Sequence, residues 1–325
     1  MATLVLLIGA PRSGTTWLQQ ILASHPAIVS PPETELFSRY LAPAVTAWDR
    51  SLDRDEQAGS PRRLKGLSTV LAADDFDAWA RSLVDRTVEQ ALATKPGASI
   101  VVEKTPGHSL VTDVIERCAP GSRIVHLVRD GRDVAASIMA AGAGWGYRWA
   151  PTTVGAAADM WREHAVAAHL GARAVGSRGF EARYEQLRDG DAEQLADVFA
   201  HCGAAIDSPA AVAYLRDHAI GTPAAASASS ISVGGAHQGR DLDEPSGFVR
   251  QGTSGDWRHE WTAAQRATFA SRAGRALIEF GYEPDDAWVG TVSPIVRARS
   301  VAARLGSRGA SRLGAWAQRR REQLP

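Results

Sequence analysis

The segment Leu4-Val-Leu-Leu-Ile8, followed directly by Gly9-Ala-Pro-Arg-Ser-Gly14-Thr-Thr-Trp17, predicts both a fold class and a binding loop. Its first five residues form a continuous apolar run, which is typical of a central strand in a parallel sheet. Residues 13–23 follow with apolar side chains at helical spacing, and a His-Pro pair ends them. A glycine-containing loop between a strand and a helix presents backbone N–H groups to an anion.

Strand and helix patterns continue to alternate along the chain. We predict strands at 99–102, 123–128 and 180–183, and helices at 133–141, 155–175, 192–201 and 263–280. This alternation predicts an α/β, P-loop-like three-layer fold with a central parallel sheet. We expect one domain over residues 1–290, with a helical cap insertion at 41–95 and a mobile lid in the Gly-, Ala- and Ser-rich stretch 219–256.

Composition excludes several classes of protein. The 325 residues carry 36 Lys+Arg and 36 Asp+Glu, and this neutral balance argues against a nucleic-acid partner. Two cysteines are too few for a disulfide framework, and no apolar run approaches the roughly 18 residues that span a bilayer. We therefore expect a cytoplasmic protein with no transmembrane segment. The arginine-rich composition suggests a GC-rich bacterial genome.

Residues 297–325 form a separate, basic segment. They hold eight arginines and one glutamate, so their net charge is +7. We predict a basic helical tail, which could contact a membrane surface or an acidic partner or remain a solvated terminal helix.

The loop after the first strand differs from a nucleotide P-loop. Thr15 stands where the nucleotide P-loop pattern GxxxxGK[ST] has its lysine, and the positively charged residue of this loop is Arg12. No strand ends in an acidic residue typical of Mg²⁺ ligation, because Glu103 is followed at once by Lys104. The Rossmann glycine pattern is also absent. The loop therefore suits a phosphate ester bound without a metal ion.

These residues resemble the 5′-phosphosulfate loop of sulfotransferases that use 3′-phosphoadenosine 5′-phosphosulfate (PAPS), in their bacterial and carbohydrate-type branch. Three further segments resemble that superfamily in order: Glu103-Lys104-Thr105-Pro106, the run from Arg123 to Ser137, and the run from Arg250 to Arg258, in which Gln251 replaces the usual lysine. The resemblance implies transfer of a sulfuryl group from PAPS to a hydroxyl, with 3′-phosphoadenosine 5′-phosphate (PAP) as product and no metal.

The resemblance also implies a set of donor-binding residues. Those implied for the 5′-phosphosulfate are Arg12, Ser13, Gly14, Thr15, Thr16 and Trp17. Those implied for the 3′-phosphate are Arg129, Ser137, Arg250, Gln251 and Gly252. Arginine suits such sites because its planar guanidinium binds two phosphate oxygens at once.

Sulfuryl transfer also needs a base for the acceptor proton and cations for the leaving phosphate. The base candidates are Glu35, which precedes a Leu-Phe step, Glu33, which is favoured by counting from His25-Pro26, and His108, which follows the EKTP segment. We expect Lys104 and Arg12 to offset the charge on the bridging oxygen, with Glu103 supporting them.

Two other functions fit the same loop. A P-loop small-molecule kinase would need Mg²⁺ and ATP, and a non-catalytic nucleotide-binding protein would bind without transfer. For a sulfotransferase, the cap and lid carry no motif that selects a small-molecule, glycolipid or natural-product acceptor, and the sequence does not predict the oligomeric state.

Overall fold

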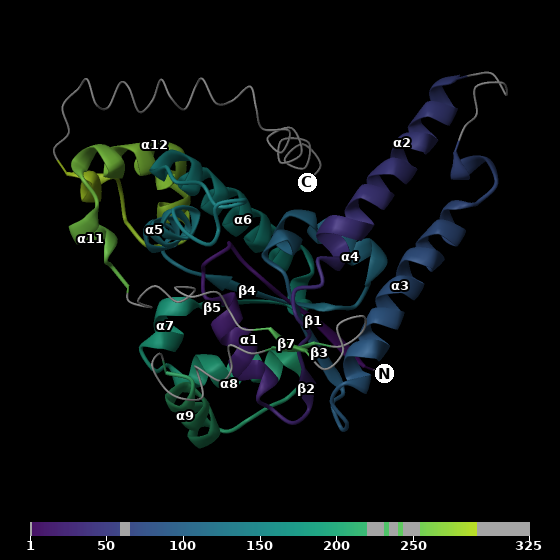
Figure 1. The fold of residues 1–325 in the computed structure, drawn as a ribbon, viewed down its shortest axis with the longest axis horizontal. Coiled ribbons are helices and arrows are strands. Elements are labelled where there is room, and N and C mark those ends of the chain that lie inside the picture. The colour runs from purple at the N-terminus through teal and green to yellow at the C-terminus, as the bar shows by residue number, and fades with distance from the viewer. Residues whose placement is uncertain (1, 59–65, 220–230, 234–239, 243–253, 291–325) are drawn as a thin grey trace. The chain divides into compact units, whose positions relative to one another are not determined.

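Five strands form a sheet in which every neighbouring pair is parallel (Figure 1). They are β1 (Thr3–Ile8), β2 (Ile28–Val29), β3 (Ile100–Lys104), β4 (Arg123–Val128) and β5 (Gly179–Arg183). The order across the sheet is β2-β3-β1-β4-β5, so β1 lies at the centre. Apolar residues at successive β1 positions are buried on both faces, as the continuous apolar run predicts. The predicted α/β class with a parallel sheet is confirmed.

This computed structural model describes residues 2–58, 66–219, 231–233, 240–242 and 254–290. The described residues fall into two compact units. One contains the residues up to Arg129 and those from Glu163 through the short antiparallel pair β6 (Ile231–Val233) and β7 (Arg240–Leu242); the other contains Asp130–Arg162 and the residues from 254 on. Most of the predicted lid at 219–256 and the whole tail at 297–325 lie outside the described residues, so both stay predictions, as do the domain bounds.

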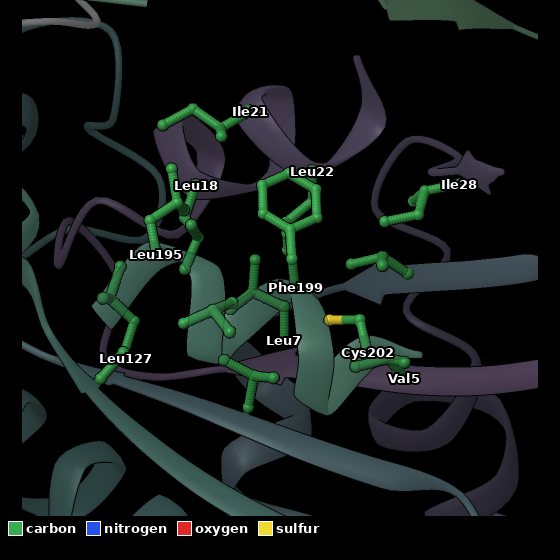
Figure 2. Close-up of a cluster of buried hydrophobic side chains, with 14 of the residues drawn as sticks. Val5, Leu7, Leu18, Ile21, Leu22, Ile28, Leu127, Leu195, Phe199 and Cys202 are labelled. Atoms are coloured by element: carbon green, nitrogen blue, oxygen red, sulfur yellow. The ribbon is translucent and has the colours of Figure 1, made fainter. Parts of the chain in front are cut away.

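In the first unit, one face of the sheet is covered by α1 (Thr15–Ala23), α8 (Ala192–Cys202) and α9 (Ser208–Asp217). Figure 2 shows the core that they enclose, in which Leu7 of β1 packs with Leu22 of α1 and Phe199 of α8. Side chains alternate along a strand, so Leu6 and Ile8 face the opposite side.

The second face is covered by the predicted cap and by two further helices. The cap consists of α2 (Ala42–Ala58) and α3 (Ala73–Ala93), which are joined through the short helix Leu67–Thr69 and lie side by side in Figure 1. Trp48 stacks on Phe76 with ring centroids 4.6 Å apart. Arg117 of α4 (Thr112–Cys118) pairs with an aspartate of each cap helix, Asp49 and Asp77. The residues of α6 (Val154–Ala174) from 163 on complete this layer.

The second unit has a core of its own, built from aromatic side chains. It contains α5 (Gly131–Gly142), the first part of α6, α11 (Trp257–Glu260) and α12 (Ala263–Glu279). Arg132 is fully buried between the rings of Trp257 and Trp288, at 3.9 and 4.7 Å, and forms ion pairs with Asp130 and Glu283. These contacts fix the start of α5, the helix that carries Ser137.

The sequence predicts no transmembrane segment and no disulfide framework, and the described residues bear on both predictions. None of their helices is long and apolar enough to cross a membrane. Both cysteines are buried free thiols: Cys202 lies in the core beneath α1 and Cys118 in the core on the other face.

Candidate active site

The loop between β1 and α1 is closed tightly by contacts that require glycine. A Cβ at Gly9 would lie 2.7 Å from the carbonyl oxygen of Leu127, and one at Gly14 would lie 2.4 Å from the ring of Tyr184. Gly14 also has a φ of 94°, which L side chains rarely adopt. Its two glycines thus let the loop pass closely over β4 and the end of β5.

The start of α1 is open to an anion. Gly14 is the N-cap and supplies no side-chain cap, and the first turn holds no acidic residue. The first-turn amides of Thr15, Thr16 and Trp17 lack intrahelical acceptors, as in any α-helix. Ser13 instead works inside the loop, where its hydroxyl donates to the carbonyl oxygen of Ala10 at 2.6 Å. Amides with a partial positive charge at a helix N-terminus attract phosphate and sulfate groups.

Two predicted site residues have unusual backbones. Among the described residues, Arg12 (φ 71°) and Glu35 (φ 53°) are the non-glycine residues with positive φ. Such conformations cost of order 1–3 kcal/mol and persist where surrounding contacts impose them, often at functional sites. The loop that contains Arg12 and the loop that contains Glu35 therefore both hold a strained backbone conformation of the kind found at functional sites.

Arg129 connects the loop to the end of β5. It follows β4 directly, its Nη1 donates to the carbonyl oxygen of Arg12 at 3.3 Å, and its guanidinium lies 4.2 Å from the ring centroid of Tyr184. Trp17 packs edge-on against the same ring at 5.7 Å and donates its Nε1–H to the carbonyl oxygen of His218. The structure thus brings Gly14, Trp17 and Arg129 together around Tyr184, a residue that sequence reasoning missed. Its only sequence signal is its place directly after a strand.

Lys104 and Glu33 meet at the end of β3. Lys104 is the last residue of β3, paired in register with Leu7 of β1, and its side chain is 4% exposed. Its Nζ donates to Oε1 of Glu33, whose side chain is 46% exposed. The pair therefore places a buried cation and a solvent-accessible carboxylate together at the carboxyl edge of the sheet, the edge at which the β1 loop also lies.

Glu103 accepts hydrogen bonds from Thr34, the residue next to Glu33, and so helps to position the Lys104–Glu33 pair. Its Oε1 accepts hydrogen bonds from the N–H and the hydroxyl of Thr34, at 3.2 and 2.7 Å, and from the hydroxyl of Thr105 at 2.8 Å. Burial alone would raise the pKa of Glu103, but the neighbouring His108 and the hydroxyls of Thr34 and Thr105 outweigh burial and lower that pKa. An ionised Glu103 thus fixes the residue between the two candidate glutamates.

His108 is fully buried, and both of its ring nitrogens face protein groups. Its Nε2 accepts the backbone N–H of Phe37 at 3.1 Å, and its Nδ1 lies 2.7 Å from Oε2 of Glu103. Because Nε2 is an acceptor, Nδ1 carries the proton of the neutral ring. These contacts suit a residue that positions the 33–37 segment, and they leave no nitrogen for an acceptor hydroxyl.

Glu35 makes different contacts from Glu33. Its backbone N–H donates to the hydroxyl of Thr105 at 3.3 Å, while its Oε2 lies 2.6 Å from Nη1 of Arg39. Both side chains of that i,i+4 pair are exposed, which is an ordinary surface ion pair. The left-handed turn at Glu35 starts the π-helix Leu36–Leu41. The contacts therefore favour Glu33 over Glu35 as the residue that faces the candidate site.

Of the residues predicted to bind the 3′-phosphate besides Arg129, the structure describes only Ser137. Ser137 lies on α5 in the second unit and is 8% exposed. Arg250, Gln251 and Gly252 lie outside the described residues.

Comparisons with known proteins agree with one another. A protein-family model described as "Sulfotransferase family" matches residues 5–208. Nodulation protein NoeE of Sinorhizobium fredii is 31% identical over 159 residues, a match that spans 47% of this chain and only 36% of that protein.

Two solved structures are among those that match. Mouse sulfotransferase SULT7A1, complexed with PAP, has a TM-score of 0.51 at 14% identity, over 86% of this chain and 89% of its own. The sulfotransferase domain of the Synechococcus PCC 7002 olefin synthase has a TM-score of 0.46 at 16% identity, over 93% and 94%.

Proposed function

The chain belongs to the sulfotransferase family, and we propose that it moves a sulfuryl group from PAPS to a hydroxyl of a small-molecule, glycolipid or natural-product acceptor, with Glu33 as the base. Membership confirms the sulfotransferase class that the sequence predicts, and the use of PAPS as donor is part of the proposal. The single observation that carries the finer proposal is the pairing of Lys104 with Glu33 at the end of β3.

For the donor, we assign the 5′-phosphosulfate to Arg12 and the amides of Thr15, Thr16 and Trp17. The uncapped α1 N-terminus supports this assignment, because an anion there would gain both hydrogen bonds and the helix dipole. We assign the 3′-phosphate to Arg129 and Ser137, together with Arg250, Gln251 and Gly252, which lie outside the described residues. Ser13 shapes the loop, and no metal ligand is required.

For the transfer, Glu33 accepts the proton of the acceptor hydroxyl while the oxygen of that hydroxyl forms its bond to sulfur. The bond between sulfur and the bridging oxygen breaks, and its electron pair leaves with the phosphate of PAP. Lys104 and Arg12 lower the barrier because they stabilise the negative charge that develops on this oxygen. Lys104 can serve both groups, since its ammonium has three N–H donors and Glu33 uses one.

The test compares Glu33→Gln with Glu35→Gln, two isosteric changes two residues apart. Loss of a general base costs about 10²–10⁴-fold in rate, so we expect Glu33→Gln to lose at least about 100-fold in kcat while PAP affinity stays unchanged. Glu35→Gln should retain activity, because only its surface pair with Arg39 is lost. Transfer is followed with radiolabelled PAPS across a panel of hydroxyl acceptors, and PAP affinity by calorimetry.

Other outcomes change the proposal in defined ways. Activity lost only in Glu35→Gln would make Glu35 the base, and wild-type turnover in both variants would exclude a glutamate base. Arg12→Ala and Lys104→Ala should each abolish turnover. PAP binding with no transfer to any acceptor would favour a non-catalytic nucleotide-binding protein.

A further inference from the structure

A second group of polar side chains lies on the α6 side of the sheet, on three elements that the proposed reaction does not use. His126 is in the middle of β4, Glu181 is its register partner in β5, and His169 is on α6. Oε2 of Glu181 lies 2.9 Å from Nδ1 of His126 and 2.7 Å from Nδ1 of His169. Two imidazole nitrogens therefore converge on one carboxylate oxygen.

We propose that His126, His169 and Glu181 form a binding site for a divalent transition metal of the Zn²⁺ type. Imidazole and carboxylate groups together suit Zn²⁺ and its neighbours in the first transition row, whereas Mg²⁺ and Ca²⁺ prefer oxygen ligands alone. One ligand atom from each of the three residues lies within 4.8 Å of the others. Bonds of about 2.0–2.2 Å place tetrahedral ligands roughly 3.3 Å apart, so small side-chain shifts complete the site.

The site is partly buried and is open to solvent on one side. His126 is fully buried, while His169 and Glu181 are each about one-third exposed, at 32% and 31%. A metal can therefore enter from solvent and keep a water as its fourth ligand.

Metal binding moves the proton within each imidazole ring from one nitrogen to the other, and each ring stays neutral. Each Nδ1–H now points at Glu181, so each ring must carry its proton on Nε2 when its Nδ1 lone pair binds the metal. The bound ion would join β4, β5 and α6, and those two strands lead into Arg129 and Tyr184 of the donor site.

The experiment uses full-length, tag-free protein treated with a chelator and titrated with Zn²⁺ by calorimetry. We expect one ion per chain and a higher Tm on saturation. Since loss of even an outer-shell partner costs about 10–100-fold in metal affinity, His169→Ala should weaken binding at least about 10-fold. The matched control is His259→Ala, an exposed histidine outside the cluster, which should bind as the wild type does.

Two further measurements keep the proposal testable if a variant folds poorly. Co²⁺ added to the wild type should give visible d–d absorption that Zn²⁺ removes, and Glu181→Gln, which keeps the side-chain shape, should weaken that Zn²⁺-sensitive absorption. Mg²⁺ should not bind. Absence of stoichiometric Zn²⁺ binding in the wild type, or unchanged affinity in both His169→Ala and Glu181→Gln, would overturn the proposal. PAP binding and sulfuryl transfer are measured separately, so failure of this site leaves the proposed activity untouched.

Discussion

Replacement of Gly14 by alanine should disrupt the donor loop, and the structure gives the size of the effect. A non-glycine residue in the left-handed region costs about 1–2 kcal/mol, and Gly14 has a φ of 94°. The new Cβ would also lie 2.4 Å from Tyr184, where carbon atoms normally stay about 3.5–4.0 Å apart. The ring is buried beneath Arg129, so its displacement adds an overpacking cost of about 1–3 kcal/mol.

The two costs sum to about 2–5 kcal/mol, which should appear as lower stability together with weaker PAP binding. Stability is measured by denaturant unfolding and PAP affinity by calorimetry. The matched control is Gly97→Ala, because Gly97 has a nearly equal φ of 90° and an added Cβ there has no atom within 4 Å. That control should show the backbone cost alone and normal PAP affinity. Equal stability and PAP affinity for Gly14→Ala and Gly97→Ala would refute the role given to the contact with Tyr184.

Two further predictions concern stability. Lys95→Met removes three hydrogen bonds that Nζ donates to the carbonyl oxygens of Ala23, His25 and Ile28 after α1; we expect a loss of about 1.5–3 kcal/mol, and an unchanged urea midpoint would contradict it. Burial lowers the pKa of His164 from 6.5 to about 4. As the pH falls, the unfolded chain therefore binds this proton before the folded chain does. The free energy of unfolding is at its full value above pH 6.5 and decreases as the pH falls toward 4. The fall is of order 3 kcal/mol, and His164→Gln, which cannot take this proton, should show a shallower pH dependence in urea unfolding; identical profiles would show that His164 is not responsible.

Local patterns predicted much of the fold, because most of the central strands contain an apolar run and alternate with helical patterns. The predicted strand at 123–128 has the bounds of β4, and the predicted helices at 192–201 and 263–280 differ from α8 and α12 by one residue at one end. The prediction missed β2, whose two residues are too few to show a pattern. It also missed α9, whose apolar face of Ala211, Tyr214 and Leu215 is short and contains one fully buried residue, Ala211.

The candidate site was predictable only where it is local. The loop from Gly9 to Thr16 is contiguous, so its glycines and Arg12 could be identified from spacing alone. The pairing of Lys104 with Glu33 joins residues 71 positions apart, and the sequence left Glu33 and Glu35 as alternatives. The sequence also suggested His108 as a base, but not that Phe37 and Glu103 would enclose its ring. Such contacts depend on which strand ends meet, which no local pattern records.

The central claim is that this enzyme recognises a 3′-phosphorylated adenosine donor through Arg129, without a metal ion. Calorimetry in the absence of magnesium tests it most directly, with PAP, adenosine 5′-phosphate and ATP as ligands and Arg275→Ala as a control at an exposed arginine. Since a charged hydrogen bond contributes about 1.5–3 kcal/mol, PAP should bind at least about 10-fold more tightly than adenosine 5′-phosphate, and Arg129→Ala should remove that preference. Equal binding of the two nucleotides, or a preference for ATP that requires magnesium, would contradict the account.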